Sequence, residues 1–344
     1  MKYLLLISIL FCSITEAKEF KIAVLYWSMS IEGQVAMRKG LEEELQKINA
    51  EAKKKKGNTV KLIPYVAGDG EAGIKNQVAQ FHEVVSKNDI DLIIIQPTDN
   101  AVLSEPLRRA NSKNIPVVTY DQFIIGGKIT SYITSNNFQA GFLDGEYIAS
   151  RFKDDYEIKL VLVEYPNVSS TVERVDGFMD ALKKSKQKYK IIKTYTAVDP
   201  ISGKKAGESI VKDFPLKGSV DVIFTVNDGG GLPIVEELSR AGRNEILVAT
   251  IDGDPRSVEN IRNKRLTVID SAQFCGELGR QSLKIAYKYL SGEKVAPKIL
   301  IPTFPITLET LSKYPGWPGG IPQSFVKPWA PNAKWDNRVL EFSK

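Results

Sequence analysis

The chain has 344 residues, of which 47 are Lys or Arg and 41 are Asp or Glu, for a formal net charge of +6. At roughly 150 residues per domain, this length predicts two lobes, each large enough for a hydrophobic core of its own. Hydrophobic residues make up 43% and charged residues 26% of the sequence, which excludes a disordered chain and a polytopic membrane protein. The only histidine, His82, leaves no basis for a histidine-rich zinc site.

The first 17 residues have the pattern of a secretory signal peptide. Lys2 supplies a positive charge, residues 3–14 are apolar but too few to span a bilayer, and Ala17 is a small residue at a suitable cleavage point. A retained membrane anchor is the alternative. We therefore expect a soluble periplasmic protein that begins at Lys18. Its single cysteine, Cys275, has no partner for an intrachain disulfide.

After residue 20, short apolar segments typical of buried strands alternate with segments of helical periodicity. In the first half, strands are expected at 21–26, 60–66, 91–95 and 116–120, with helices at 35–48 and 74–85. In the second half, strands are expected at 159–163, 189–195, 220–226, 246–251 and 266–269, with helices at 139–152, 171–184, 231–241 and 255–263. Two such series predict an α/β protein with two doubly wound parallel-sheet lobes.

Polar residues follow several of these strands, at the edge of an open parallel sheet where ligands bind. Aspartate and asparagine also cap helices at such junctions, and this alternative applies most to Asp99 and Asp228. It applies less to Asp121, because the apolar residues after it do not begin a helix. The strand-end residues are Asp99, Asp121, Gln122, Asn227, Asp228 and Asp252.

The order and spacing of these segments across residues 20–300 resemble the type 1 periplasmic binding proteins of the ribose/galactose-binding class. The resemblance implies two lobes joined by a three-segment hinge that closes on a small ligand. It divides the chain into an N-terminal lobe of residues 18–134 plus 274–301 and a C-terminal lobe of residues 135–273. The segments that carry it are IIQPTD (94–99), IPVVTYD (115–121), VERVDGF (172–178), FTVND (224–228) and ATIDG (249–253).

The resemblance also implies ligand-binding residues. Asp121 matches an aspartate that accepts hydrogen bonds from sugar hydroxyls, and Gln122 stands beside it where an arginine is common. Arg174 matches an arginine that donates to ring or hydroxyl oxygens from a helix of the second lobe. Carboxylates that accept, and an arginine and amides that donate, suit a polyol. The remaining matches are the strand-end residues Asn227 and Asp252 and the hinge-side amide Gln273.

The sequence departs from the family at the aromatic residues that usually stack on the sugar. Gly33 and Gln34 stand where an aromatic pair would follow the first strand. We expect Tyr26 and Trp27 to take the place of this pair, and the alternative for Tyr26 is a core position in its strand. The departure leaves open which sugar or sugar-like polyol is bound, and whether the ligand is a sugar at all.

Residues 302–344 form a Pro/Trp-rich C-terminal strap outside the resemblance. Seven of the 17 prolines lie within 302–331, and proline disfavours helices and central strands. Three of the four tryptophans, Trp317, Trp329 and Trp335, also lie in the strap. We expect the strap to be extended and to pack on a lobe. The alternative is a docking surface for a membrane partner.

Together these features predict a periplasmic solute-binding protein that delivers a sugar or sugar-like polyol to an inner-membrane ABC transporter. The alternative is a periplasmic sensor component that reports to a membrane histidine kinase or chemoreceptor. A secreted hydrolase with Asp121 and Asp252 as acid and base is a third hypothesis, but such residues beside an arginine suit binding better than turnover. We expect a monomer that is not an enzyme and has no cofactor, no metal and no nucleic-acid partner.

Overall fold

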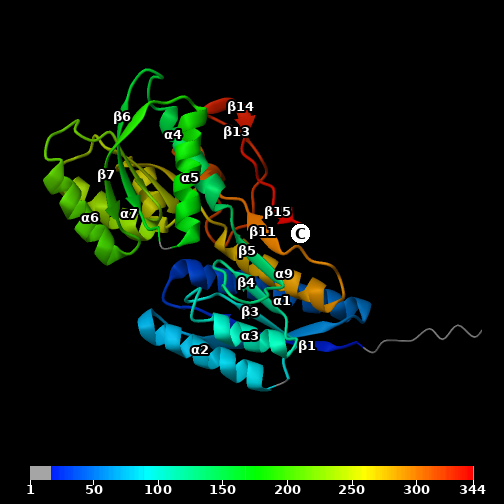
Figure 1. Cartoon of the computed structure of the whole chain (residues 1–344). Helices are drawn as coiled ribbons and strands as arrows, with labels where there is room; N and C mark the ends of the chain where they lie inside the picture. The colour runs from blue at the N-terminus through cyan, green and yellow to red at the C-terminus, as the bar shows by residue number, and fades with distance from the viewer. Residues whose placement is uncertain (1–16, 88, 167, 344) are drawn as a thin grey trace, which may run out of the picture.

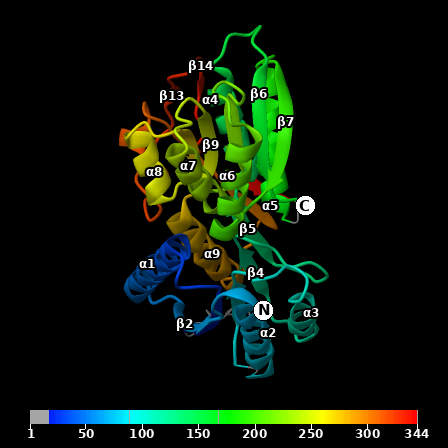
Figure 2. The ribbon, with the colours of Figure 1, turned by 90° about the vertical axis from the view of Figure 1, so that its left-hand side faces the viewer.

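The computed structural model describes residues 17–87, 89–166 and 168–343, so the predicted signal peptide at 1–17 lies almost entirely outside the described residues. Two separate sheets with helices on both faces form two lobes, one above the other (Figures 1 and 2). This confirms the predicted α/β fold with two parallel-sheet lobes. No helix within the described ranges has both the length and the apolar character to cross a membrane.

The first sheet has seven strands in the order β15-β11-β5-β4-β3-β1-β2. All neighbours are parallel except β15, which pairs antiparallel with β11 at the sheet edge. The strands are β1 (Glu19–Tyr26), β2 (Thr59–Val66), β3 (Leu92–Ile95), β4 (Val117–Tyr120), β5 (Ser131–Ser135), β11 (Lys298–Ile301) and β15 (Leu340–Phe342). The helices of this lobe are α1 (Glu32–Lys55), α2 (Gly70–Lys87), α3 (Ser104–Ser112) and α9 (Cys275–Leu290).

The apolar strands of this sheet are buried on both faces because each face is covered by a pair of helices. Alternate side chains of β3 point to opposite faces. Ile94 packs with residues of α1 and α9 in one core. Ile93 and Ile95 pack with residues of α2 and α3 in another.

The second sheet has six strands in the order β12-β10-β9-β8-β6-β7, all parallel except the edge strand β12. Residues of α4 and α5 share one core with the sheet, and residues of α6 and α7 share the other. The strands are β6 (Ile158–Glu164), β7 (Tyr189–Thr196), β8 (Val222–Thr225), β9 (Leu247–Asp252), β10 (Thr267–Ala272) and β12 (Phe304–Ile306). The helices are α4 (Asn137–Ala149), α5 (Ser169–Lys184), α6 (Pro200–Asp213), α7 (Asp228–Arg240) and α8 (Pro255–Arg262).

The sequence patterns did not predict α3, α6 or β5. Helix α6 is initiated by Asp199, whose carboxylate accepts hydrogen bonds from the N–H groups of Ile201 and Ser202 in a capping box. Gly203 weakens the helical signal in the sequence. It is required because α6 packs closely on α7, where a Cβ at Gly203 would lie 2.4 Å from the Gly230 carbonyl oxygen.

The chain passes between the two sheets at three places: between β5 and α4, between β10 and α9, and between β11 and β12. Hydrogen bonds join these crossing segments. Ser135 Oγ donates to Gln273 Oε1 at 2.8 Å, and the Asn136 N–H donates to the Ile301 carbonyl at 2.7 Å. The three segments therefore lie side by side, as a hinge requires.

The strap, residues 302–344, is attached to both lobes and not to one alone. Its strand β12 belongs to the second sheet, whereas β15 belongs to the first. Between them, Arg280 of α9 donates to the carbonyls of residues 318–319, and Lys327 forms an ion pair with Glu146 of α4. The red ribbon in Figure 1 follows this path through the hairpin of β13 (Val326–Lys327) and β14 (Ala330–Lys334).

The tryptophans of the strap make hydrogen bonds inside the protein. This use of the indole N–H groups favours a structural strap over a docking surface built from the tryptophans. The bonds run from Trp317 Nε1 to the Asp252 carbonyl at 2.7 Å, from Trp329 Nε1 to Glu146 Oε2 at 2.9 Å, and from Trp335 Nε1 to the Thr303 carbonyl at 2.8 Å.

Trp335 anchors the strap, because it is fully buried and its ring lies 5.1 Å from that of Phe304 and 5.4 Å from that of Phe325. We predict that Trp335→Ala lowers the free energy of unfolding by about 3–5 kcal/mol, the usual cost of emptying such a site. Phe342→Ala is the control: this side chain is 45% exposed, and its loss should cost less than about 1 kcal/mol. Denaturant unfolding measures both, and equal losses would contradict the anchoring role.

Candidate functional site

Arg174 of α5 lies at the centre of a hydrogen-bond network near the hinge and is only 6% exposed. Its Nε donates to Asn137 Oδ1 at 2.9 Å. Its Nη1 donates to the Val226 carbonyl at 2.7 Å and to Asp252 Oδ1 at 3.0 Å. A buried guanidinium needs such partners to offset its lost hydration. Nη2 has no hydrogen bond to any described residue and is not fully buried, so it can donate to a ligand.

Asp252 ends β9 and connects this arginine to the hinge. Its Oδ1 also accepts from Gln273 Nε2 at 2.7 Å, and Gln273 Oε1 in turn accepts from Ser135 Oγ at 2.8 Å. Within the described part of the chain, Oδ2 of Asp252 has no hydrogen-bond partner, and it is not among the fully buried atoms without a partner. This oxygen is therefore accessible to a ligand.

Asp121 directly follows β4 of the first lobe. Its Oδ2 accepts from Gln96 Nε2 at 3.0 Å, whereas Oδ1 has no partner among residues the structure describes. Burial raises the pKa of Asp121, the Gln96 hydrogen bond and the charge of Arg174 lower it, and the charge of Asp252 raises it. Asp121 of the first lobe is therefore close enough to Arg174 and Asp252 of the second lobe for their charges to act on its carboxylate.

Both site aspartates have backbone conformations that L-amino acids rarely adopt. The φ angle is 64° at Asp121 and 134° at Asp252, and such angles are strained unless the surroundings hold them. Thr134 Oγ1 and Tyr132 Oη donate to the Asp121 carbonyl at 3.0 and 3.1 Å. The Asp252 carbonyl accepts from Trp317 Nε1 at 2.7 Å. These bonds hold each peptide group in place and so orient each carboxylate.

Three of the eight residues expected to bind ligand share this hydrogen-bond network: Arg174, Asp252 and Gln273. A fourth, Asp121, makes no hydrogen bond to them among the described residues, but the charges of Arg174 and Asp252 act on its carboxylate. Gln122 lies beside Asp121 and is partly buried, and its side chain makes no hydrogen bond within the described residues. Among the expected ligand-binding residues, Asp121 comes from the first lobe. Arg174 and Asp252 come from the second lobe, and Gln273 comes from the hinge.

The structure places the other expected residues differently. Tyr26 is 1% exposed in the core of the first lobe, with the Arg38 guanidinium 5.1 Å from its ring centre, so the core alternative is correct for it. Trp27 is partly buried just after β1. Asn227 is an N-cap: its Oδ1 accepts from the Gly230 N–H, and its Nδ2 donates to the Val198 carbonyl. Both ends of this amide are therefore used within the protein.

Sequence reasoning missed three residues that form hydrogen bonds with the expected site residues: Gln96, Asn137 and Trp317. Gln96 stands in the strand-end segment 94–99, so its position just after a strand could have identified it. Asn137 begins α4 immediately after the first crossing segment. Trp317 lies in the strap, and no local pattern linked it to Asp252.

A buried carboxyl pair supports the turn that follows Asp252. Asp270 Oδ1 accepts from the Gly253 N–H at 2.9 Å, and Asp228 Oδ2 accepts from the Asp254 N–H at 2.8 Å. Burial raises the pKa of Asp270 to about 8, and burial followed by the nearby charge of Asp270 raises the pKa of Asp228 well above its ordinary value. The raised pKa values favour the protonated form of this pair in the folded protein. No metal-binding group of three or more His, Cys, Asp or Glu occurs among the described residues.

This pair predicts a pH-dependent stability. Between the unfolded-state pKa of about 4 and the folded-state pKa of about 8 for Asp270, the native protein binds more protons than the unfolded chain. The free energy of unfolding should therefore fall as the pH rises from about 5 to about 8. Asp270→Asn keeps the shape but cannot ionise, so its stability should fall less. Urea unfolding across this range measures both, and parallel profiles would contradict the assignment.

Comparison with known proteins identifies the relatives of this chain. A family model described as a periplasmic binding protein domain matches residues 22–294. The ribose import binding protein of Escherichia coli is 28% identical over 223 residues, which cover 64% of this chain and 71% of that protein. The ribose import binding protein of Bacillus subtilis is 26% identical over 296 residues, which cover 85% of this chain and 88% of that protein.

Solved structures show the same fold. A solute-binding protein of an ABC transporter from Actinobacillus succinogenes, with bound D-allose, has a TM-score of 0.71 and 21% identity, covering 86% of this chain and all of that chain. A solute-binding protein from Bacillus halodurans, with bound myo-inositol, also has a TM-score of 0.71 and 21% identity, covering 88% and 99%. Because the family match extends from β1 through α9, the chain belongs to the periplasmic binding protein domain family.

Proposed function

We propose that this protein captures a sugar or sugar-like polyol between its two lobes and delivers it to an ABC permease of the inner membrane. The observation that carries the proposal is a set of unpaired polar atoms from both lobes. They are Oδ1 of Asp121, Oδ2 of Asp252 and Nη2 of Arg174, each accessible and without a partner among the described residues.

The chemistry of these atoms favours a neutral polyol. A hydroxyl group donates and accepts at once, so one hydroxyl can donate to a carboxylate while its neighbour accepts from the guanidinium. Such charge-assisted bonds are stronger than bonds between neutral groups. The two carboxylates disfavour an anionic ligand, because like charges in a poorly hydrated site repel one another strongly. Trp27 and Gln122 complete the proposed site.

The position of these groups suggests the mechanism. Asp121 belongs to the first lobe, whereas Arg174 and Asp252 belong to the second. A ligand bonded to all three stabilises the arrangement in which the lobes approach, and so shifts the population towards it. The proposed lobes are residues 18–134 plus 274–301 and residues 135–273, which move about the three crossing segments. The permease would recognise this closed form.

We also propose that the protein acts after export, as a monomer without catalytic activity. Removal of residues 1–17 would leave a soluble mature protein that begins at Lys18. In the proposed site, Arg174 and Gln273 bind one oxygen of Asp252, and Gln96 binds one oxygen of Asp121. This arrangement favours ground-state binding over proton transfer by either carboxyl group.

A ligand panel tests the function. The mature protein is unfolded thermally with pentoses, hexoses and inositols, including D-ribose, D-allose and myo-inositol. A ligand at 100 times its dissociation constant should add about 2.7 kcal/mol of stability, enough to raise the midpoint by several degrees. If folded protein shows no shift with any member of the panel, the proposed ligand class is wrong.

A matched pair of variants tests the site. Asp121→Asn preserves shape but removes the acceptor charge, so the affinity for the ligand found in the panel should fall at least about tenfold. Asp99→Asn is the control, because Asp99 also follows a strand of the first lobe but accepts from the N–H groups of Ala101 and Val102. Its affinity should equal that of the wild type in calorimetric titration. Wild-type affinity in Asp121→Asn would refute the site assignment.

A further inference from the structure

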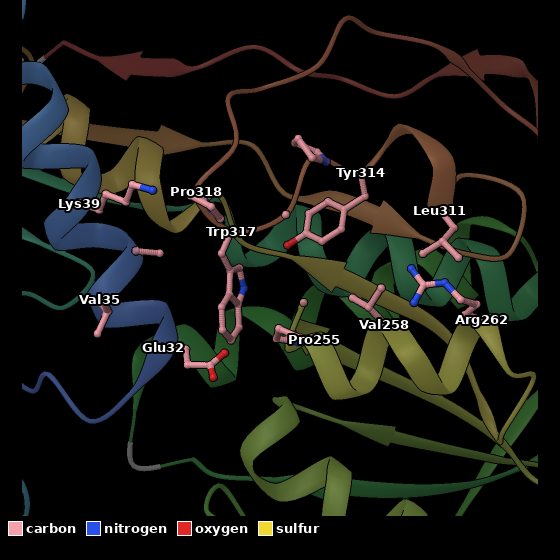
Figure 3. A pocket seen from close by; sticks show the side chains of 14 residues that line it. Glu32, Val35, Lys39, Pro255, Val258, Arg262, Leu311, Tyr314, Trp317 and Pro318 are labelled. Carbon is pink, nitrogen blue, oxygen red and sulfur yellow. The ribbon is translucent and has the colours of Figure 1, made fainter.

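The strap places one aromatic side chain between the two lobes. Figure 3 shows Trp317 pointing down between α1 and Pro255 at the start of α8. A cavity of about 570 Å³ lies there, lined by residues of α1, of α8 and of the strap. Val35 comes from the first lobe, Val258 from the second and Tyr314 from the strap. Trp317 therefore meets both lobes at once.

The main chain around Trp317 is bound to the first lobe. The Gly276 N–H of α9 donates to the Trp317 carbonyl at 2.9 Å. Arg280 Nη2 of the same helix donates to the carbonyls of Pro318 and Gly319 at 3.2 and 3.1 Å. The indole ring also covers Gly33 of α1, where a Cβ would lie 3.9 Å from the ring.

The indole N–H is bound to the second lobe. It donates to the Asp252 carbonyl at 2.7 Å, where the main-chain N–H of Gln273 also donates at 3.1 Å. Asp252 has a φ angle of 134°, so its peptide group needs partners to keep this strained conformation. One of these partners is a side chain whose own backbone is attached to the other lobe.

We propose that Trp317 is a positioning residue for the ligand site: it orients Asp252 and couples that residue to the position of the first lobe. Rotation of the lobes has to break either the single indole bond or the three bonds from Gly276 and Arg280 of α9 to the strap carbonyls. Because one hydrogen bond is weaker than three, Trp317 stays with the first lobe and releases Asp252 when the lobes separate. The Asp252 carbonyl then keeps both of its donors, the Trp317 indole and the Gln273 N–H, only when the lobes approach.

Two tryptophan variants separate this role from a general contribution to stability. Trp317→Phe keeps an aromatic ring but removes the N–H donor. Trp329→Phe is the matched control, because Trp329 Nε1 donates to Glu146 of α4 and not to a residue of the site network. With D-ribose, D-allose and myo-inositol as probes in calorimetric titration, we expect Trp317→Phe to bind roughly threefold to tenfold more weakly, which corresponds to one lost hydrogen bond. Wild-type affinity in Trp317→Phe, or an equal loss in Trp329→Phe, would overturn the proposal.

The ligand readout rests on the proposed function, so a second measurement uses the protein without sugar. Spin labels on Gln46→Cys of α1 and Lys205→Cys of α6 report the distance between the lobes, and both positions are exposed. The native Cys275 is 3% exposed and should not be labelled. Trp317→Ala should populate longer distances than the wild type, whereas Trp329→Ala should not.

The two measurements fail in different ways. An unchanged distance distribution in Trp317→Ala would overturn the coupling, whatever the protein binds. If no sugar binds the wild type, the proposed function fails, and the distance distribution alone decides the role of Trp317.

Discussion

A buried guanidinium imposes the strongest constraint on this structure. Arg174 is nearly inaccessible to solvent, and the loss of its hydration has to be offset by hydrogen bonds. The helix that carries it packs so closely on α4 that a Cβ at Gly141 would lie 1.8 Å from the Arg174 carbonyl oxygen. This close packing fixes the position of the Arg174 main chain. Asn137 and Asp252 then hold its head group, and through Asp252 the network reaches Gln273 and the hinge.

Two strained backbone positions lie at the proposed site. The two aspartates with accessible oxygens are also two of the non-glycine residues with positive φ, and each carbonyl is held by two donors. For Asp121 these donors come from the neighbouring strand β5 of its own lobe. For Asp252 they come from the hinge and from the strap. Asp121 is thus held by groups of its own lobe, whereas Asp252 is held by groups attached to both lobes. This difference is a physical basis for linking ligand binding to lobe position.

The parts of the molecule that could be predicted are those with a local signature. The fully buried β3 reads as a strand from four consecutive apolar residues, and Arg174 and Asp252 stand in short segments whose order along the chain is characteristic. Tyr26 could not be placed, because its ring is enclosed by core residues from several elements and by Arg38 of α1, and the local sequence does not show this packing. Asparagine is suited both to binding a ligand and to capping a helix, so the residue type at Asn227 does not distinguish the two roles. Trp317 had no signal at all, since its partner Asp252 lies far away along the chain and the strap has no periodicity.

The most direct test of the account is a crystal structure of the mature protein grown with the sugar that gives the largest thermal shift. The account predicts sugar hydroxyls within hydrogen-bond distance of Asp121 on the first lobe and of Arg174 and Asp252 on the second, with the Trp317 indole still bound to the Asp252 carbonyl. A sugar held by one lobe alone, or seated in the cavity between α1 and α8 without contact to Asp121 and Arg174, would contradict it.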